Sequence, residues 1–187
     1  MTKMTKKKTL LANPWLSLMQ IEDPDRGVSG YVYAHETRSD GKIILVLPFR
    51  SKADSQFGGI EVLFRREVTP CWGMESNLSG ITGGVESQDT AEDALRELEE
   101  EAGYSISRED LIFLGTTRAS KGMDTVYYLY AANVEGKSQA KAAGDGSRLE
   151  SEGSVEWHDS AMDCEDAIAT CAYFRLIWAM LHWRQSK

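Results

Sequence analysis

Residues 83–104, GGVESQDTAEDALRELEEEAGY, constrain the fold more than any other stretch, because they specify one helix at both of its ends. Asp89 is a good N-cap residue and stands three positions before Glu92, which is the spacing of a capping box. Gly103 is well placed to end the helix in a left-handed conformation. The stretch therefore predicts a helix from Thr90 to Ala102.

The predicted helix carries an apolar arc and an acidic arc side by side. Glu97, Glu100 and Glu101 converge in the acidic arc, and like charges at these offsets destabilise a helix by a few tenths of a kcal/mol per pair. Glu92 can pair with Arg96, the one basic residue among eight carboxylates, which leaves those three glutamates uncompensated. The neighbouring arc can face a core, and its members are Ala91, Ala94, Leu95, Leu98 and Ala102.

A hard divalent cation such as Mg²⁺ or Mn²⁺ would resolve this conflict of charges. Such ions prefer oxygen ligands and often lie between a carboxylate and the phosphates of a substrate. The competing interpretation is an acidic helix that merely faces water, as most charge runs do. Asp93 and Glu99 are expected in solvent under either interpretation, and the spacing alone leaves both open.

The carboxyl half of the stretch has a more specific pattern. Residues 96–104 fit R-E-Φ-x-E-E-x-G-Φ, where Φ is apolar or aromatic, at every fixed position, and this segment resembles the Nudix box. The amino half departs from the family spacing, since Gln88 stands where a Glu belongs and Thr82 where a Gly belongs. We interpret the departure as a shortened loop, in which residues 83–86 supply the usual glycines and Glu, and Asp89 supplies the acidic residue near the helix start.

The resemblance implies a fold and a chemistry. The fold is α/β, a Nudix-like α/β/α sandwich with a mixed sheet between helices. The chemistry is hydrolysis of a diphosphate bond in a nucleoside diphosphate linked to another moiety, with bound Mg²⁺ or Mn²⁺. The residues that match the family's metal site are Glu97, Glu100 and Glu101, the carbonyl of Gly83 or Gly84, and Arg96, which orients the carboxylates.

The general base and the substrate contacts are less constrained. The resemblance implies that the base comes either from the box helix, as Glu97 or Glu101, or from a later loop, where Glu150 and Glu152 are the candidates. Guanidinium and ammonium groups pair with phosphate oxygens, so four further residues are candidate substrate partners. They are Arg65, Arg66, Arg118 and Lys121, each of which is otherwise an exposed structural charge.

The remaining elements follow from alternation and turn signals. Strand-like runs at 31–36 and 42–49 flank Asp40-Gly41, a hairpin signal, and predict a β-meander at the start of the domain. Residues 60–70 alternate like a strand with one wet face. Further strands are expected at 111–119, 124–134 and 155–157, and a helix at 164–184 has a core stripe of Ile168, Cys171, Ala172, Leu176, Ala179, Met180 and Trp183.

Composition narrows the class of protein. A net charge of −8 disfavours binding to duplex nucleic acid, and no convincing membrane span or signal peptide is present. Three cysteines without a C-x-x-C spacing indicate idle thiols in a reducing cytoplasm rather than a zinc site. We expect a disordered start at 1–8 and one Nudix-like domain at 9–187.

Three functional hypotheses follow. The first is a metal-dependent pyrophosphohydrolase acting on a small nucleotide, as a monomer or homodimer. The second is a Nudix-like nucleotide-binding module without catalysis, which the intact glutamates disfavour. The third is a structural domain with an acidic helix, which would have no affinity for Mg²⁺ or Mn²⁺.

Overall fold

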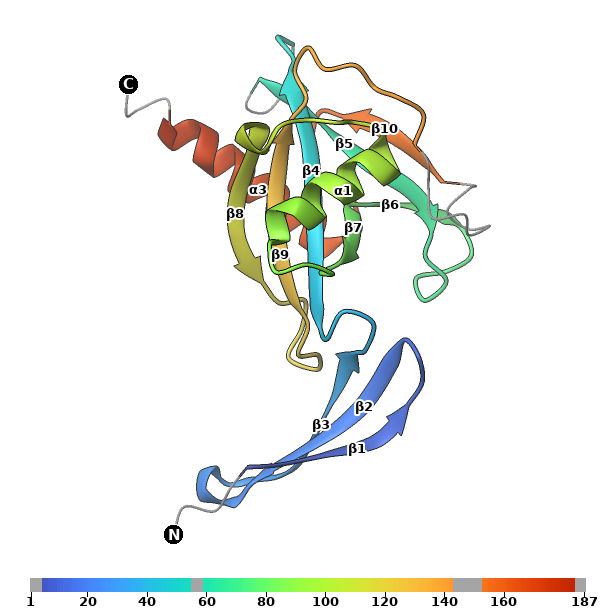
Figure 1. Cartoon of the computed structure of the whole chain (residues 1–187), viewed down its shortest axis with the longest axis vertical. Helices are drawn as coiled ribbons and strands as arrows, with labels where there is room; N and C mark the ends of the chain where they lie inside the picture. Colours follow the sequence, from blue (N-terminus) through green and yellow to red (C-terminus); the bar gives the residue numbers. More distant parts are fainter. Residues whose placement is uncertain (1–4, 55–58, 143–152, 184–187) are drawn as a thin grey trace.

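A mixed sheet lies between two helices, α1 (Thr90–Ala102) and α3 (Ala167–Trp183), in the computed structural model, which describes residues 5–54, 59–142 and 153–183 (Figure 1). The strand order is β10-β5-β4-β9-β8, with β6 paired to β5 and β7 to β4. These strands are β4 (Lys42–Ser51), β5 (Ile60–Val68), β6 (Ser76–Ser79), β7 (Ile81–Gly84), β8 (Leu111–Thr117), β9 (Val126–Asn133) and β10 (Ser154–His158). The predicted α/β sandwich is confirmed.

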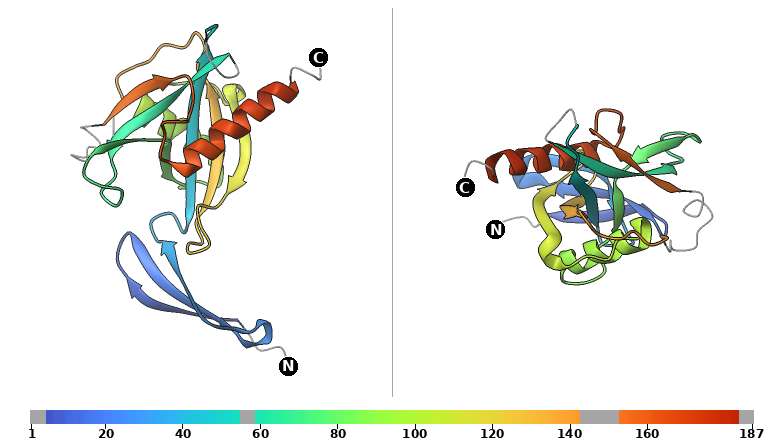
Figure 2. Two further views of the ribbon diagram at one scale, coloured as in Figure 1. Left: turned by 180° about the vertical axis from the view of Figure 1, so that it is seen from behind. Right: turned by 90° about the horizontal axis from the view of Figure 1, so that it is seen from above.

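The central strand β4 builds a core on each face of the sheet. Leu45 and Leu47 pack in the cluster that includes residues of α3, whereas Ile44 and Val46 pack in the cluster that includes residues of α1. β4 pairs in parallel with β9 along most of its length and antiparallel with β5 and β7. The view from above shows α1 and α3 on opposite faces of this sheet (Figure 2).

Helix α1 begins and ends where the sequence predicts. The Ala91 N–H donates to the side chain of the N-cap Asp89 at 3.0 Å. Gly103 has a φ of 72° and donates its N–H to the carbonyl of Glu99 at 3.0 Å. Ala91, Ala94, Leu98 and Ala102 are buried as expected, with Leu95 half-buried. The expectation for Asp93 is wrong, because its carboxylate is buried and accepts hydrogen bonds from the Ser87 N–H and hydroxyl.

The amino-terminal residues form a separate three-stranded sheet of β1 (Lys6–Ala12), β2 (Leu16–Asp23) and β3 (Val28–Glu36). This sheet projects from one end of the body in Figure 1. β1 begins at Lys6, so part of the expected disordered start lies in a strand. Two hydrogen bonds join β3 to the β8–β9 loop, from the Ala34 N–H to the Gly122 carbonyl and from the Asp124 N–H to the Ala34 carbonyl.

The predicted hairpin between β3 and β4 is wrong, although its turn exists. Asp40 and Gly41 both have positive φ angles, 53° and 69°, and the Gly41 N–H donates to the Glu36 carbonyl at 2.9 Å. However, β3 pairs with β2, and β4 pairs with β5, β7 and β9. The turn therefore leads the chain from one sheet into the other.

Other strand predictions hold with smaller corrections. β8 and β9 are antiparallel neighbours, and β10 contains the predicted residues 155–157. β5 has no wet face over its first six residues, because Glu61 and Arg65 are buried along with the apolar side chains. The short strands β6 and β7 were not predicted.

The helix expected from Cys164 begins at Ala167 instead. Of its predicted stripe, Ile168, Ala172 and Leu176 are buried, and Cys171 and Met180 are partly buried against the same core. Two short 3₁₀ helices, Pro24–Arg26 and Arg108–Asp110, complete the described elements. No helix among the described residues is long and apolar enough to cross a membrane.

Candidate active site

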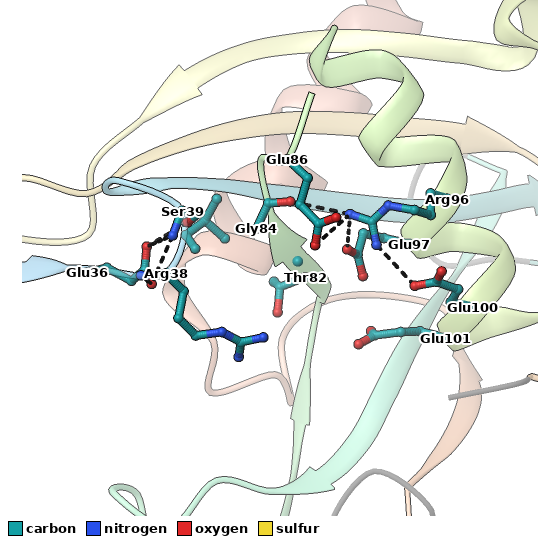
Figure 3. Close-up of a pocket in the computed structure, with 12 residues that line it drawn as sticks. Glu36, Arg38, Ser39, Thr82, Gly84, Glu86, Arg96, Glu97, Glu100 and Glu101 are labelled. Atoms are coloured by element: carbon teal, nitrogen blue, oxygen red, sulfur yellow. Dashed lines mark hydrogen bonds and ion pairs between the residues drawn. The ribbon is translucent and has the colours of Figure 1, made fainter. Parts of the chain in front are cut away.

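A hollow of about 240 Å³ opens between α1, β7 and the connection from β3 to β4 (Figure 3). β7 pairs with β4, with Gly83 opposite Ile44 and Gly84 opposite Ile43, and this pairing holds the glycines beside the acidic arc of α1. Twelve residues line the hollow: Glu36, Arg38, Ser39, Ile43, Thr82, Gly83, Gly84, Glu86, Arg96, Glu97, Glu100 and Glu101. The fold thus brings together every residue of the predicted metal site.

Glu97 lies directly against the backbone of Gly83. A Cβ atom at position 83 would be 1.9 Å from the Glu97 carboxylate, so any larger residue there would displace this carboxylate from its observed position. Glu97 is 7% exposed. The glycine pair therefore has a steric role in the site, beyond any role of its carbonyl groups.

Arg96 lies near four carboxylates of the acidic cluster. Its guanidinium lies 2.8 Å from Glu97 and 3.1 Å from Glu100, with Glu86 and Asp93 at 3.7 and 3.8 Å. It also donates to the Gly84 carbonyl at 3.5 Å. The expectation that Glu97 and Glu100 are uncompensated is wrong, because Arg96 pairs with both of them.

Glu101 is held from the other side by Arg65. Nη1 of Arg65 lies 3.6 Å from the Glu101 carboxylate, and its Nε donates to Glu67 at 2.8 Å. Arg65 is only 4% exposed and does not line the hollow. The position of Arg65 suits a residue that orients Glu101 more than one that reaches a phosphate.

The surroundings of Glu97 in the hollow shift its pKa far from the ordinary value of a glutamate. Burial raises the pKa of Glu97 to about 7, and the neighbouring Glu100 adds to the rise, although Arg96 opposes both. A carboxyl group with a pKa near neutrality exchanges protons readily at physiological pH. In the metal-free site Glu97 can therefore exchange a proton near neutral pH.

Three residues at the opposite rim were not predicted, namely Glu36, Arg38 and Ser39. Burial pushes the pKa of Glu36 upward, but hydrogen bonds from Ser39 and Arg38 outweigh burial and keep this pKa below its ordinary value. Figure 3 shows Arg38 reaching into the hollow from the side opposite Glu101. The charged residues in the TRSDG turn could have indicated this side of the site, but the sequence analysis interpreted the turn only as a hairpin.

The hollow offers carboxylate and backbone carbonyl oxygens, which are the ligand types that a hard divalent cation prefers. The arrangement is not preassembled, because within the described residues no three His, Cys, Asp or Glu side chains are gathered as a metal site. Arg96 instead contacts Glu97, Glu100 and the Gly84 carbonyl. A bound cation would have to share or replace the contacts that this guanidinium makes.

The remaining predicted residues lie elsewhere. Glu150 and Glu152 are outside the described residues. Arg66 pairs with Glu156 on β10 at 2.7 Å. Arg118 and Lys121 line a second hollow of about 740 Å³, between the amino-terminal sheet and the β8–β9 loop. Its other lining residues are Lys7, Ile21, Tyr31, Tyr33, Ala119, Ser120, Met123 and Asp124.

Comparison with known proteins supports the predicted fold independently of the site geometry. The family model described as NUDIX domain matches residues 38–170. No curated protein sequence matches the chain. A solved structure of an "ADP compounds hydrolase" superimposes with a TM-score of 0.68 and 16% identity, over 95% of this chain and 93% of that one. A "MutT/nudix family protein from Enterococcus faecalis" has a TM-score of 0.46 and 19% identity, over 63% and 42%.

Proposed function

Because the chain belongs to the Nudix family and is thus a hydrolase acting on phosphoric anhydrides of small nucleotides, we propose that it cleaves the diphosphate bond of a nucleoside diphosphate linked to another moiety. The observation that carries the proposal is the acidic arc of α1, which faces a hollow that also contains Arg38 and Arg96. Five carboxylates and two guanidinium groups line this hollow. An anionic diphosphate would be repelled there without added positive charge.

That charge is proposed to come from Mg²⁺ or Mn²⁺, since the Nudix family generally uses divalent cations. A bound cation neutralises phosphate oxygens and increases the acidity of water. The residues that would hold it are Glu97, Glu100, Glu101 and the carbonyl of Gly83 or Gly84. Arg96 keeps the carboxylates in place, and Arg65 holds Glu101.

The reaction needs a proton acceptor beside the attacking water. Water forms a new P–O bond, the bridging P–O bond breaks, and a proton of the water passes to a carboxylate. Glu97 is the proposed acceptor because its carboxylate lines the hollow and lies against Gly83. Its pKa of about 7 belongs to the metal-free site, and a bound cation would lower it. Glu101, Glu150 and Glu152 remain the alternative bases.

Substrate contacts are proposed on both sides of the scissile bond. Arg38 extends into the hollow, with its guanidinium carbon 4.9 Å from the ring centroid of Trp15 and no ion pair to a carboxylate in the described part of the chain. We propose that this guanidinium meets a phosphate oxygen. Arg118 and Lys121 are proposed to contact the part of the nucleotide that lies away from this bond, in the second hollow. The net charge and the cysteine pattern favour a cytoplasmic small-molecule enzyme.

The decisive test is hydrolysis by purified protein with a panel of diphosphates, with and without Mg²⁺ or Mn²⁺. ADP derivatives come first, because the solved structure that matches most of this chain belongs to an "ADP compounds hydrolase". Glu100→Gln removes one ligand charge at constant shape and should abolish turnover while the fold survives. Glu99→Gln, on the exposed face of the same helix, is the control and should keep full activity. Equal turnover by the Glu100 variant and the parent would show that the site is wrong.

A further inference from the structure

Strand β5 directs alternate side chains toward α1. Leu63 is buried in the core cluster that also contains Leu98 of α1. Arg65 and Glu67 follow Leu63 at every second residue, so they lie on the same face of the strand. On α1, Glu101 follows Leu98 by three residues and lies on the same side of the helix. The shared core thus brings Arg65 up to the acidic arc.

A buried guanidinium group needs a carboxylate partner, and Arg65 lies between two of them. Its Nε donates to Glu67 at 2.8 Å, whereas its Nη1 lies 3.6 Å from the carboxylate of Glu101. The first distance is that of a charge-assisted hydrogen bond, and the second is longer than a hydrogen bond. Arg65 therefore directs this close hydrogen bond away from the acidic arc.

Glu67 is itself held by the neighbouring strand β6. The hydroxyl of Ser79 donates to the second carboxylate oxygen of Glu67 at 3.0 Å. Ser79 is buried and stands directly opposite Arg65 in the pairing of β5 with β6. Each oxygen of Glu67 thus accepts a hydrogen bond from a buried residue of the sheet, which fixes the carboxylate beside the guanidinium of Arg65.

We propose that Glu67 is a positioning residue of the metal site, which keeps Glu101 available to a divalent cation by holding Arg65. This inference rests on the proposed function, which assigns Glu101 to the cation. Without the charge of Glu67, the buried guanidinium would turn to Glu101, which it already faces. Arg65 would then compete with the cation. With Glu67 in place, the carboxylate of Glu101 is directed into the hollow (Figure 3).

The next residue of β5 forms an equivalent pair away from the site. Arg66 donates from its Nε to Glu156 of β10 at 2.7 Å. Because side chains alternate along a strand, Arg66 lies on the opposite face of β5 from Arg65. Neither Arg66 nor Glu156 lines the hollow. Glu156→Gln therefore removes the same charge from the same kind of pair without touching the acidic arc.

The test measures the affinity of the full chain for Mn²⁺ by electron paramagnetic resonance and for Mg²⁺ by calorimetry. Glu67→Gln keeps the size of the side chain and removes its charge. Both cations should bind about 10–100-fold more weakly, the loss that follows when a partner of a metal ligand is altered. Glu156→Gln is the matched control and should bind like the parent. Melting temperatures with a chelator show whether each variant is folded during the titration.

Two further substitutions separate positioning from a merely structural role. Ser79→Ala keeps every charge and removes one hydrogen bond to Glu67, so Mn²⁺ binding should weaken in the same direction but less. This variant also carries the test if Glu67→Gln does not fold. Arg65→Met removes the guanidinium through which Glu67 acts. Adding Glu67→Gln to Arg65→Met should therefore change the Mn²⁺ affinity by less than about threefold.

The inference is overturned if Glu67→Gln binds Mn²⁺ as tightly as the parent, or if the Glu156 control loses as much affinity. An undiminished effect of Glu67→Gln in the Arg65→Met protein would overturn it too. Glu100→Gln shows whether the bound Mn²⁺ lies at this site, because it removes a proposed ligand. A parent that binds no Mn²⁺, or whose binding Glu100→Gln leaves unchanged, would overturn the proposed function as well. Tight binding by the Glu67 variant alone would leave that function standing.

Discussion

Replacing Glu97 by glutamine should stabilise the protein in the absence of metal. The folded structure raises the pKa of this carboxyl group from 4.5 to about 7, chiefly through burial. At about 1.4 kcal/mol for each tenfold change in proton affinity, the ionised form costs the folded state about 3 kcal/mol above neutral pH. This value already includes the attraction of Arg96. Water reaching the hollow screens part of the effect, so we expect a gain of about 1–3 kcal/mol.

The sign of the pH dependence follows from the same shift. Between pH 4.5 and about 7 the folded protein keeps a proton on Glu97 that the unfolded chain has released. The free energy of unfolding therefore falls as the pH rises through this window. Glu97→Gln has no such proton, so its advantage should be complete at about pH 8 and mostly gone at about pH 5.

Urea unfolding with a metal chelator, at both pH values, measures this advantage. Glu99→Gln is the control, because Glu99 is exposed on the same helix, and its stability should follow that of the parent. Addition of Mg²⁺ at the higher pH should raise the stability of the parent more than that of the Glu97 variant. A variant less stable than the parent at about pH 8, or an advantage that does not shrink on acidification, would refute the electrostatic argument.

Two further substitutions test the glycine loop and the helix start. Gly83→Ala should displace Glu97, whose carboxylate lies 1.9 Å from the new Cβ position, and should weaken both the affinity for Mg²⁺ and the Mg²⁺-dependent rise in melting temperature. Gly122→Ala, where the new atom would have a 3.6 Å contact, should change neither measurement. Asp89→Ala should cost about 0.5–2 kcal/mol in chemical unfolding because the Ala91 N–H loses its acceptor. Asp89→Ser keeps an acceptor and should recover most of that loss, and equal stability of all three proteins would contradict the capping role.

Helix α1 was predictable because its limits depend on neighbouring residues. Asp89 caps the first turn and Gly103 ends the last one, and both interactions act within a few residues. The same holds for the placing of Glu97, Glu100 and Glu101 beside one another, which helical geometry alone determines. The exception is Asp93, whose burial depends on Ser87 in the preceding loop and not on the helix.

Strand partners depend on distant residues and were harder to predict. The turn at Asp40-Gly41 formed as expected, yet the local signal contains no information about which sheet receives the next strand. β4 is buried on both faces and pairs in parallel with the distant strand β9, with Lys42 opposite Val126. The pairing of β4 with β7, with Ile43 opposite Gly84, places the preceding Arg38 at the rim of the hollow opposite α1. The missed site residues are therefore those whose position depends on the sheet.

The capping of helix α1 offsets the electrostatic cost of its acidic site. Gathering Glu97, Glu100 and Glu101 on one arc opposes helix formation, and burial makes the ionised Glu97 more costly still. The helix forms regardless, because Asp89 and Gly103 satisfy its ends and the fully buried Leu98 anchors its apolar arc. The helix caps and the apolar arc thus compensate for the negative charge that Arg96 and Arg65 leave in the site. A divalent ion should therefore increase both the stability and the activity of this protein, and a cation that raises one without the other would separate the two roles.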